Sequence, residues 1–232
     1  MQIVTEGIIL RKIKYGENSS IVHIFTRQGG IRHFIVKGVQ GGKKKQSAFF
    51  FPLTNLEFIM NATQDDKLGY IKDVRIVRTY KTIYQDIKKS TVVQFLAEVL
   101  SHVLANETQN TELFDFIKEK LQDFDNNESQ PDFHILFLLD ITAHLGFSPQ
   151  KQKQQQKEAQ KYFNLRDGCF CEEKPLHEDY FQGRKAELWD KLIHEKIVRE
   201  RLTLLEAMLH YYRIHTGLPN IKSLQVLHEV FM

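Results

Sequence analysis

The sequence predicts an α+β fold, in which a small N-terminal five-stranded β-barrel is followed by an all-helical domain. Residues 1–80 contain short runs rich in β-branched side chains, separated by turn clusters. From residue 82 onward, apolar residues recur at three- and four-residue spacings, which is typical of amphipathic helices. The charge changes at the same place, because residues 1–80 have a net charge of +7 and the remainder has −4.

Each strand of the expected barrel is bounded by turn residues. The turns fall at 15–18 (Tyr-Gly-Glu-Asn) and at 28–30 (Gln-Gly-Gly). Five short antiparallel strands within about 80 residues fit a small closed barrel of the OB type, and an SH3-like barrel is the nearest alternative. The predicted strands cover 3–14, 19–27, 31–37, 53–61 and 67–78.

The helical domain is expected to span residues 81–232. Thr111 is a candidate helix cap, and Pro131 suits the first turn of the next helix. Residues 150–161 are polar and of low complexity, and residues 162–182 are expected to be irregular, so an insertion is predicted at about 150–183. The predicted helices cover 90–105, 111–124, 131–146, 184–196 and 198–215, with a last one from Ser223.

The sequence carries no signature of an enzyme. Residues 38–45 are rich in glycine and lysine but lack the phosphate-loop spacing, and His194-Glu195 is not followed by the second histidine of a helical zinc site. The acidic pair Asp65-Asp66, which a nuclease could use, falls in an expected turn. We therefore predict a protein that is not an enzyme and needs no cofactor.

The chain is expected to reside in the cytoplasm and to have no membrane partner. Its first ten residues lack the basic and apolar regions of a signal peptide, and no run approaches 18 apolar residues. Cys169 and Cys171 are its two cysteines. One close pair supplies half of the ligands that a tetrahedral zinc site usually needs, so no metal site is predicted.

The basic residues of the barrel predict a surface that holds a polyanion. They lie near strand ends and in one loop, where they could converge on a groove and displace counterions from phosphates. Tyr15, Phe34 and the run Phe49-Phe50-Phe51 could stack on bases, or could be core residues. The basic residues are Arg11, Lys12, Lys14, Arg27, Arg32, Lys37, Lys43, Lys44 and Lys45.

Several motifs together resemble the RecO family of bacterial DNA repair proteins. The first is E-G-I-I-L-x(5)-G-E-x-S-x-I-V-x-I-F-T-x-x-G-G, from Glu6 to Gly30. It is followed by Val-Lys-Gly-Val at 36–39, the lysine loop, and Phe-Pro-Leu at 51–53. The C-terminal stretch 204–223, with Gly-Leu-Pro at 217–219, is similar as well. The resemblance covers the whole chain in the same order.

The resemblance implies an OB-fold, a helical domain and a non-catalytic recombination mediator of the RecF pathway. It also implies a location in the bacterial cytoplasm, in association with the nucleoid. Such proteins bind single- and double-stranded DNA and anneal complementary strands. With RecR they help to load RecA onto DNA covered by single-stranded DNA-binding protein (SSB), and they contact the SSB C-terminal tail. An interaction scaffold that does not bind nucleic acid directly is the alternative.

Carried onto this sequence, the family's basic DNA-contacting segment falls on Lys37, Lys43, Lys44 and Lys45, with Arg11 and Arg32 as neighbours. Together with Lys12 from the basic end of the first strand, these are the predicted DNA-binding residues. Many family members hold zinc with two cysteine pairs. Here a glutamine- and lysine-rich tract replaces the first pair, and Cys169 and Cys171 are a remnant of the second. We therefore expect residues 162–182 to be held by packing.

Overall fold

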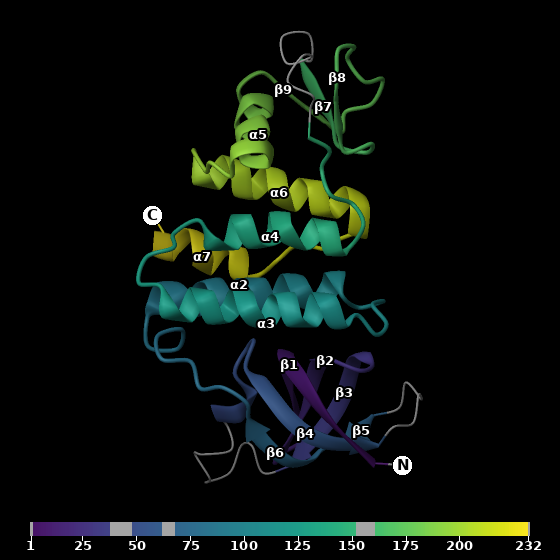
Figure 1. Cartoon of the computed structure of the whole chain (residues 1–232), viewed down its shortest axis with the longest axis vertical. Coiled ribbons are helices and arrows are strands. Elements are labelled where there is room, and N and C mark those ends of the chain that lie inside the picture. Colours follow the sequence, from purple (N-terminus) through teal and green to yellow (C-terminus); the bar gives the residue numbers. More distant parts are fainter. Residues whose placement is uncertain (1, 38–47, 62–67, 152–160, 232) are drawn as a thin grey trace. The chain divides into compact units, whose positions relative to one another are not determined.

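A computed structural model of the chain describes residues 2–37, 48–61, 68–151 and 161–231 (Figure 1). The chain forms two compact units. The first contains residues 1–128 together with 220–232, and the second contains 129–219. The described strands of the barrel lie in the first unit with three helices. Within the described residues, no helix is both long and apolar enough to cross a membrane.

The first unit contains a curled sheet whose described strands follow the order β5-β3-β2-β1-β4-β6. The strands pair antiparallel, except that β3 and β5 pair in parallel. β5 and β6 lie at opposite edges of the sheet and are separated in sequence by Ile71 alone, so the sheet curls into a half-barrel. The bounds are β1 (Gln2–Tyr15), β2 (Ser19–Thr26), β3 (Gly30–Lys37), β4 (Asn55–Asn61), β5 (Gly69–Tyr70) and β6 (Lys72–Ile76).

This architecture confirms the predicted α+β class with an N-terminal OB-type barrel. The strand expected over 67–78 is divided into β5 and β6, because the chain leaves the edge of β3 and joins the edge of β4. Asp73, with a φ of 50°, lies in the irregular part of that second pairing.

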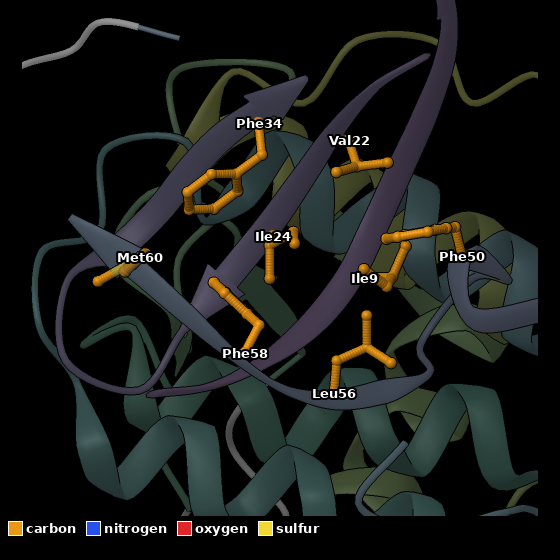
Figure 2. Packing of buried hydrophobic residues seen from close by; sticks show 8 residues of the cluster. All are labelled: Ile9, Val22, Ile24, Phe34, Phe50, Leu56, Phe58 and Met60. Carbon is orange, nitrogen blue, oxygen red and sulfur yellow. The ribbon is translucent and has the colours of Figure 1, made fainter. Parts of the chain in front are cut away.

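The core of the barrel follows from the alternation of side chains along each strand. Every second residue points inward, and the inward residues pack against one another (Figure 2). Phe50, from the 3₁₀ turn η1 (Ala48–Phe50), completes the cluster. Its other members are Ile9, Val22, Ile24, Phe34, Leu56, Phe58 and Met60.

The helices of the first unit are α2 (Ile87–Val103), α3 (Thr111–Asn126) and α7 (Ser223–Phe231). The side chain of Asp86 caps α2, and that of Asn110 caps α3 by accepting the N–H of Leu113 at 3.0 Å. The sequence prediction placed the α3 cap at Thr111, one residue too late. The carboxylate of Glu98 on α2 accepts the N–H of Ser223 at 2.9 Å and thereby holds the start of α7.

Two ion pairs and one aromatic contact join the sheet to α3. Arg27 donates two hydrogen bonds to the Asp115 carboxylate, at 3.1 and 2.7 Å. The Lys118 ammonium lies 2.7 Å from the Glu6 carboxylate. Phe25 of β2 packs on Phe114, with ring centroids 5.9 Å apart. One half of the outer side of β1 and β2 is thereby covered.

The segment between the sheet and α2, residues 80–86, is fixed by the C-terminal end of α3. We refer to this segment as the junction. The carboxylate of Asp125 accepts the backbone N–H groups of Lys81, Thr82 and Ile83, at 2.8, 2.8 and 3.0 Å. The buried ammonium of Lys89 donates to Thr82 Oγ1 and to the carbonyls of Phe124 and Asn127, and the carbonyl of Asp125 lies 3.3 Å from it. These bonds satisfy groups that the end of a helix otherwise leaves unpaired.

The second unit contains α4 (Phe133–His144), α5 (Gly183–Glu195), α6 (Arg201–Thr216) and a small sheet of β7 (Tyr162–Asn164), β8 (Cys169–Cys171) and β9 (Tyr180–Gln182). Residues 162–182 were expected to be irregular, and this expectation was wrong. Phe163 is the cross-strand partner of both Phe170 and Phe181, and it packs with Trp189 and Tyr211. Three-residue strands are too short for their alternation to be read from the sequence.

Candidate nucleic-acid interface

The half of the outer sheet surface that lies beyond the α3 contacts combines cations, aromatic rings and apolar side chains. Cross-strand partners share one side of a sheet. The row Arg11–His23–His33 is followed by Ile13–Ile21–Ile35 and then by Tyr15–Ser19–Lys37, and Tyr70 of β5 lies beside Ile35. We call this surface the outer platform. It consists of Arg11, Ile13, Tyr15, Ser19, Ile21, His23, His33, Ile35, Lys37 and Tyr70.

Exposed tyrosines next to cations give the outer platform its chemistry. Tyr15 is 53% exposed and Tyr70 is 58% exposed. The Lys37 ammonium lies 5.9 Å from the centre of the Tyr70 ring, and Arg11 is exposed at the opposite end. Single-strand binding surfaces combine backbone-neutralising cations with rings on which bases stack. The platform has both groups at positions fixed by strand register.

The two histidines of the platform contact each other edge to face, with ring centroids 4.2 Å apart. Burial lowers the pKa of His23, the neighbouring His33 and Arg11 lower it as well, and together they bring it to about 4. His23 is therefore neutral near pH 7. Arg11 and Lys37 give the platform positive charge at that pH.

We expect an NMR titration of the His23 ring to have its midpoint near pH 4. Because this pKa lies below the ordinary value of a histidine, the stability linked to it is lost as the pH falls from about 6.5 toward 4. Arg11→Ala should raise the midpoint slightly, because burial is the larger cause. A midpoint close to 6.5 in the native protein would contradict this description of the platform.

The predicted DNA-binding residues do not lie on one face. Arg11 and Lys37 are on the outer platform. Lys12 is paired with Val22, an inward-facing residue, and Arg32 is paired with Ile24, which also faces inward. Lys12 is nevertheless exposed, because β4 pairs with β1 only as far as Ile8. The predicted residues Lys43, Lys44 and Lys45 lie outside the described residues.

Other residues noted in the sequence have structural contacts. Arg27 is bound to Asp115, and Lys14 shares the inward-facing side of β1 with Lys12. Phe34 and Phe50 are buried in the barrel core, whereas Phe51 is 47% exposed and packs on Tyr84. Tyr70 was missed by the sequence analysis. The sequence gives only a weak indication that Tyr70 lies on this surface, because its strand has two residues and pairs with β3 in parallel.

A pocket of about 470 Å³ adjoins the platform at the end of β3. Ile35 is the last residue of β3 that pairs with β5, and β3 continues for two residues beyond it, so the sheet opens there. The apolar walls come from Val36, Phe49, Phe50, Ile71 and Val74, and Ile35, Lys37, Tyr70 and Asp73 also line the pocket. Ile35, Lys37 and Tyr70 therefore belong to both the pocket and the platform.

The zinc site that the resemblance implies for many members does not fit the residues of this chain. Cys169 and Cys171 lie on one short strand, and the Cys171 thiol is 3.3 Å from the carbonyl of Glu173. Burial raises the pKa of both thiols, as does the charge of Asp167, which disfavours the thiolate that a zinc ion requires. Over the described ranges, no three His, Cys, Asp or Glu side chains are grouped as metal ligands.

Comparison with known proteins agrees with this architecture. The family model for the N-terminal part of recombination protein O matches residues 1–80, and the model for its C-terminal part matches residues 84–225. The chain belongs to the RecO family. This family comprises DNA repair and recombination proteins, so the chain has a role of that kind.

Similar RecO proteins match along the whole chain. The DNA repair protein RecO of Flavobacterium psychrophilum is 33% identical, with all of both chains covered. Those of Christiangramia forsetii and Flavobacterium johnsoniae are each 31% identical over the full length of both chains. The matches therefore include the barrel, the helices and the small sheet of the second unit.

Proposed function

We propose that this RecO-family chain is a non-catalytic recombination mediator that binds single- and double-stranded DNA through its barrel. The outer platform supports the proposal most directly, because Arg11 and Lys37 are exposed on one sheet face together with Tyr15 and Tyr70. Cations bind the strand through its phosphates, and rings bind it through its bases. Both contacts are independent of base sequence.

The same chemistry supports strand annealing. Two single strands repel each other until their phosphates are neutralised, and a protein that neutralises both backbones allows them to approach and pair. The predicted residues Lys12, Arg32, Lys43, Lys44 and Lys45 would add to this neutralisation. In this proposal the chain positions DNA and breaks no covalent bond.

We extend the proposal to the partners that the family resemblance implies. With RecR, the chain would help to load RecA onto SSB-coated DNA in the bacterial cytoplasm. Because the SSB tail is acidic and apolar, its binding site should be an apolar groove with Lys or Arg at the rim. Family membership supports these partners.

The double variant Arg11→Ala/Lys37→Ala tests the platform. We expect the affinity for labelled single-stranded DNA to fall by roughly tenfold, measured by fluorescence anisotropy over a series of salt concentrations. The slope of log K against log salt should become shallower by about 1.4, since each neutralised phosphate contributes about 0.7. The matched control is Lys81→Ala/Lys88→Ala, which removes the same charge at two exposed positions that follow the barrel in sequence.

The outcome separates a specific surface from a general effect of charge. Equal losses in the two double variants would mean that net charge, and not the outer platform, determines binding. The triple variant Lys43→Ala/Lys44→Ala/Lys45→Ala should also weaken binding and flatten the salt dependence. If the wild-type protein bound no DNA even at low salt, the interaction-scaffold alternative would stand instead.

A further inference from the structure

The pocket at the end of β3 is lined by both apolar and polar residues, a combination that suits the base and the phosphate of one nucleotide. Val36, Phe49, Phe50, Ile71 and Val74 form an apolar part of its lining, and its volume of about 470 Å³ falls within the roughly 300–1,000 Å³ that is usual for ligand pockets. The residues with polar groups that line the pocket are Lys37, Tyr70 and Asp73. A flat apolar ligand with a hydrogen-bond donor edge and an anionic attachment satisfies all of these groups.

We infer that this pocket receives one unstacked nucleobase of the strand that lies on the outer platform, and that it prefers a base with an exocyclic amino group. The inference rests on the proposed function, because it concerns the same strand. Lys37 and Tyr70 line both the platform and the pocket, so a strand that follows the platform passes the pocket mouth.

The position of charge sets the orientation of the nucleotide. The Asp73 carboxylate repels a phosphate, whereas the Lys37 ammonium attracts it. The phosphate therefore stays at Lys37, where it is shared with the platform, and the base enters between the apolar walls. Flat rings can then contact Phe49 or Tyr70 as they contact aromatic residues in other single-strand sites.

The carboxylate also gives the pocket a base preference. Asp73 can only accept hydrogen bonds when ionised, and the amino group of cytosine is a donor that carboxylates read. Thymine carries a carbonyl oxygen at the corresponding position. This oxygen and the carboxylate are both hydrogen-bond acceptors, so they would repel each other. Cytosine and thymine are both single-ring pyrimidines, but thymine also has a C5 methyl group and an N3–H group. The effect of Asp73→Asn on the preference therefore identifies the part that the carboxylate contributes.

The backbone conformation at Asp73 allows a substitution that changes the carboxylate and leaves the backbone unstrained. Its φ of 50° lies in the left-handed region, which Asp and Asn tolerate better than most residues. Asp73→Asn therefore keeps the shape and the backbone preference while it replaces one acceptor oxygen by a donor. Glu17→Gln, at an exposed position in the β1–β2 turn, makes the same change of charge at a residue that does not line the pocket.

The test compares labelled 15-nucleotide oligo-dC and oligo-dT at pH 7.5 by fluorescence anisotropy. We expect wild-type protein to bind oligo-dC roughly fivefold or more tightly than oligo-dT. Asp73→Asn should bring the ratio to within about twofold, and Glu17→Gln should leave it unchanged. Val74→Phe, which narrows the pocket, should lower the ratio as well, with its folding checked by circular dichroism.

The outcomes distinguish this inference from the proposed function. If both oligonucleotides bind with the same affinity and salt dependence, and Asp73→Asn changes neither, the base pocket is wrong while DNA binding by the platform stands. If neither oligonucleotide binds at low salt, the proposed function fails and the pocket inference fails with it.

Discussion

Replacing Asp125 with Ala is expected to lower the free energy of unfolding of the first unit by about 2–4 kcal/mol. The change leaves the N–H groups of Lys81, Thr82 and Ile83 without their acceptor, and an unsatisfied buried donor costs about 1–3 kcal/mol. Part of this cost is recovered where water reaches the junction, because Lys81 is exposed. Urea unfolding followed by far-UV circular dichroism measures the loss.

The matched control for this variant is Asp123→Ala. Asp123 is an exposed acidic residue on the same turn of α3, two positions earlier, and its loss should change the unfolding free energy by less than about 0.5 kcal/mol. Equal effects at the two positions would show that the junction bonds do not contribute to stability.

The same carboxylate should make the first unit sensitive to acid. Burial acts to raise the pKa of Asp125, but the hydrogen bonds from Lys81, Thr82 and Ile83 outweigh it, so the pKa lies below the ordinary value. A depressed carboxyl pKa gives stability that is present above the unfolded-state pKa and is lost as the pH falls through the folded-state value. Asp125→Ala should therefore flatten the decline of stability below about pH 4.

Gly30→Ala is expected to destabilise the first unit by at least about 3 kcal/mol. Gly30 has a φ of 64°, and an added Cβ would lie 2.1 Å from the carbonyl oxygen of Glu107 and 2.9 Å from that of Thr108. Both contacts are with backbone, so no side chain can move aside. The loop between α2 and α3 would have to shift, or the turn between β2 and β3 would have to open.

Gly16→Ala separates the two causes. Gly16 has nearly the same φ, 66°, but an added Cβ there meets nothing within 4 Å. Its cost should be about 1 kcal/mol, which is the conformational part alone. Thermal unfolding of the two variants measures the difference. Similar midpoints would mean that the contact with Glu107 is easily relieved.

The sequence predicted the barrel well because each of its strands has a strong local signal. Leu56, Phe58 and Met60 alternate with Asn55, Glu57, Ile59 and Asn61, and all three are buried. The signal fails where structure depends on distant partners. β5 has two residues and exists only because β3 lies beside it, and β7 exists because Phe163 packs with Trp189 and Tyr211.

The candidate site was predictable in composition but not in geometry. Basic residues on the first strands were evident, yet which side of the sheet they occupy depends on register. The register shift between Ile9 and Arg11 places Arg11 on the outer side and Lys12 on the inner side. Arg27 looked equally available in the sequence, and its pairing with Asp115 spans 88 residues. The pocket could not be foreseen, because it arises where β3 extends beyond its pairing with β5.

The junction also limits how the protein can be divided. The two family models meet between residues 80 and 84, which suggests a seam between exchangeable modules. Asp125 accepts hydrogen bonds from the backbone N–H groups of residues 81–83. A chimaera that exchanges the N-terminal part at this boundary would therefore combine the Asp125 carboxylate of one protein with the junction of another. A swap carried through to residue 128 moves both sides of the contact together. Chimaeras of family members joined between residues 80 and 84 should therefore fold poorly. Chimaeras joined after α3, at residue 128, should keep the contact between Asp125 and the junction and fold normally.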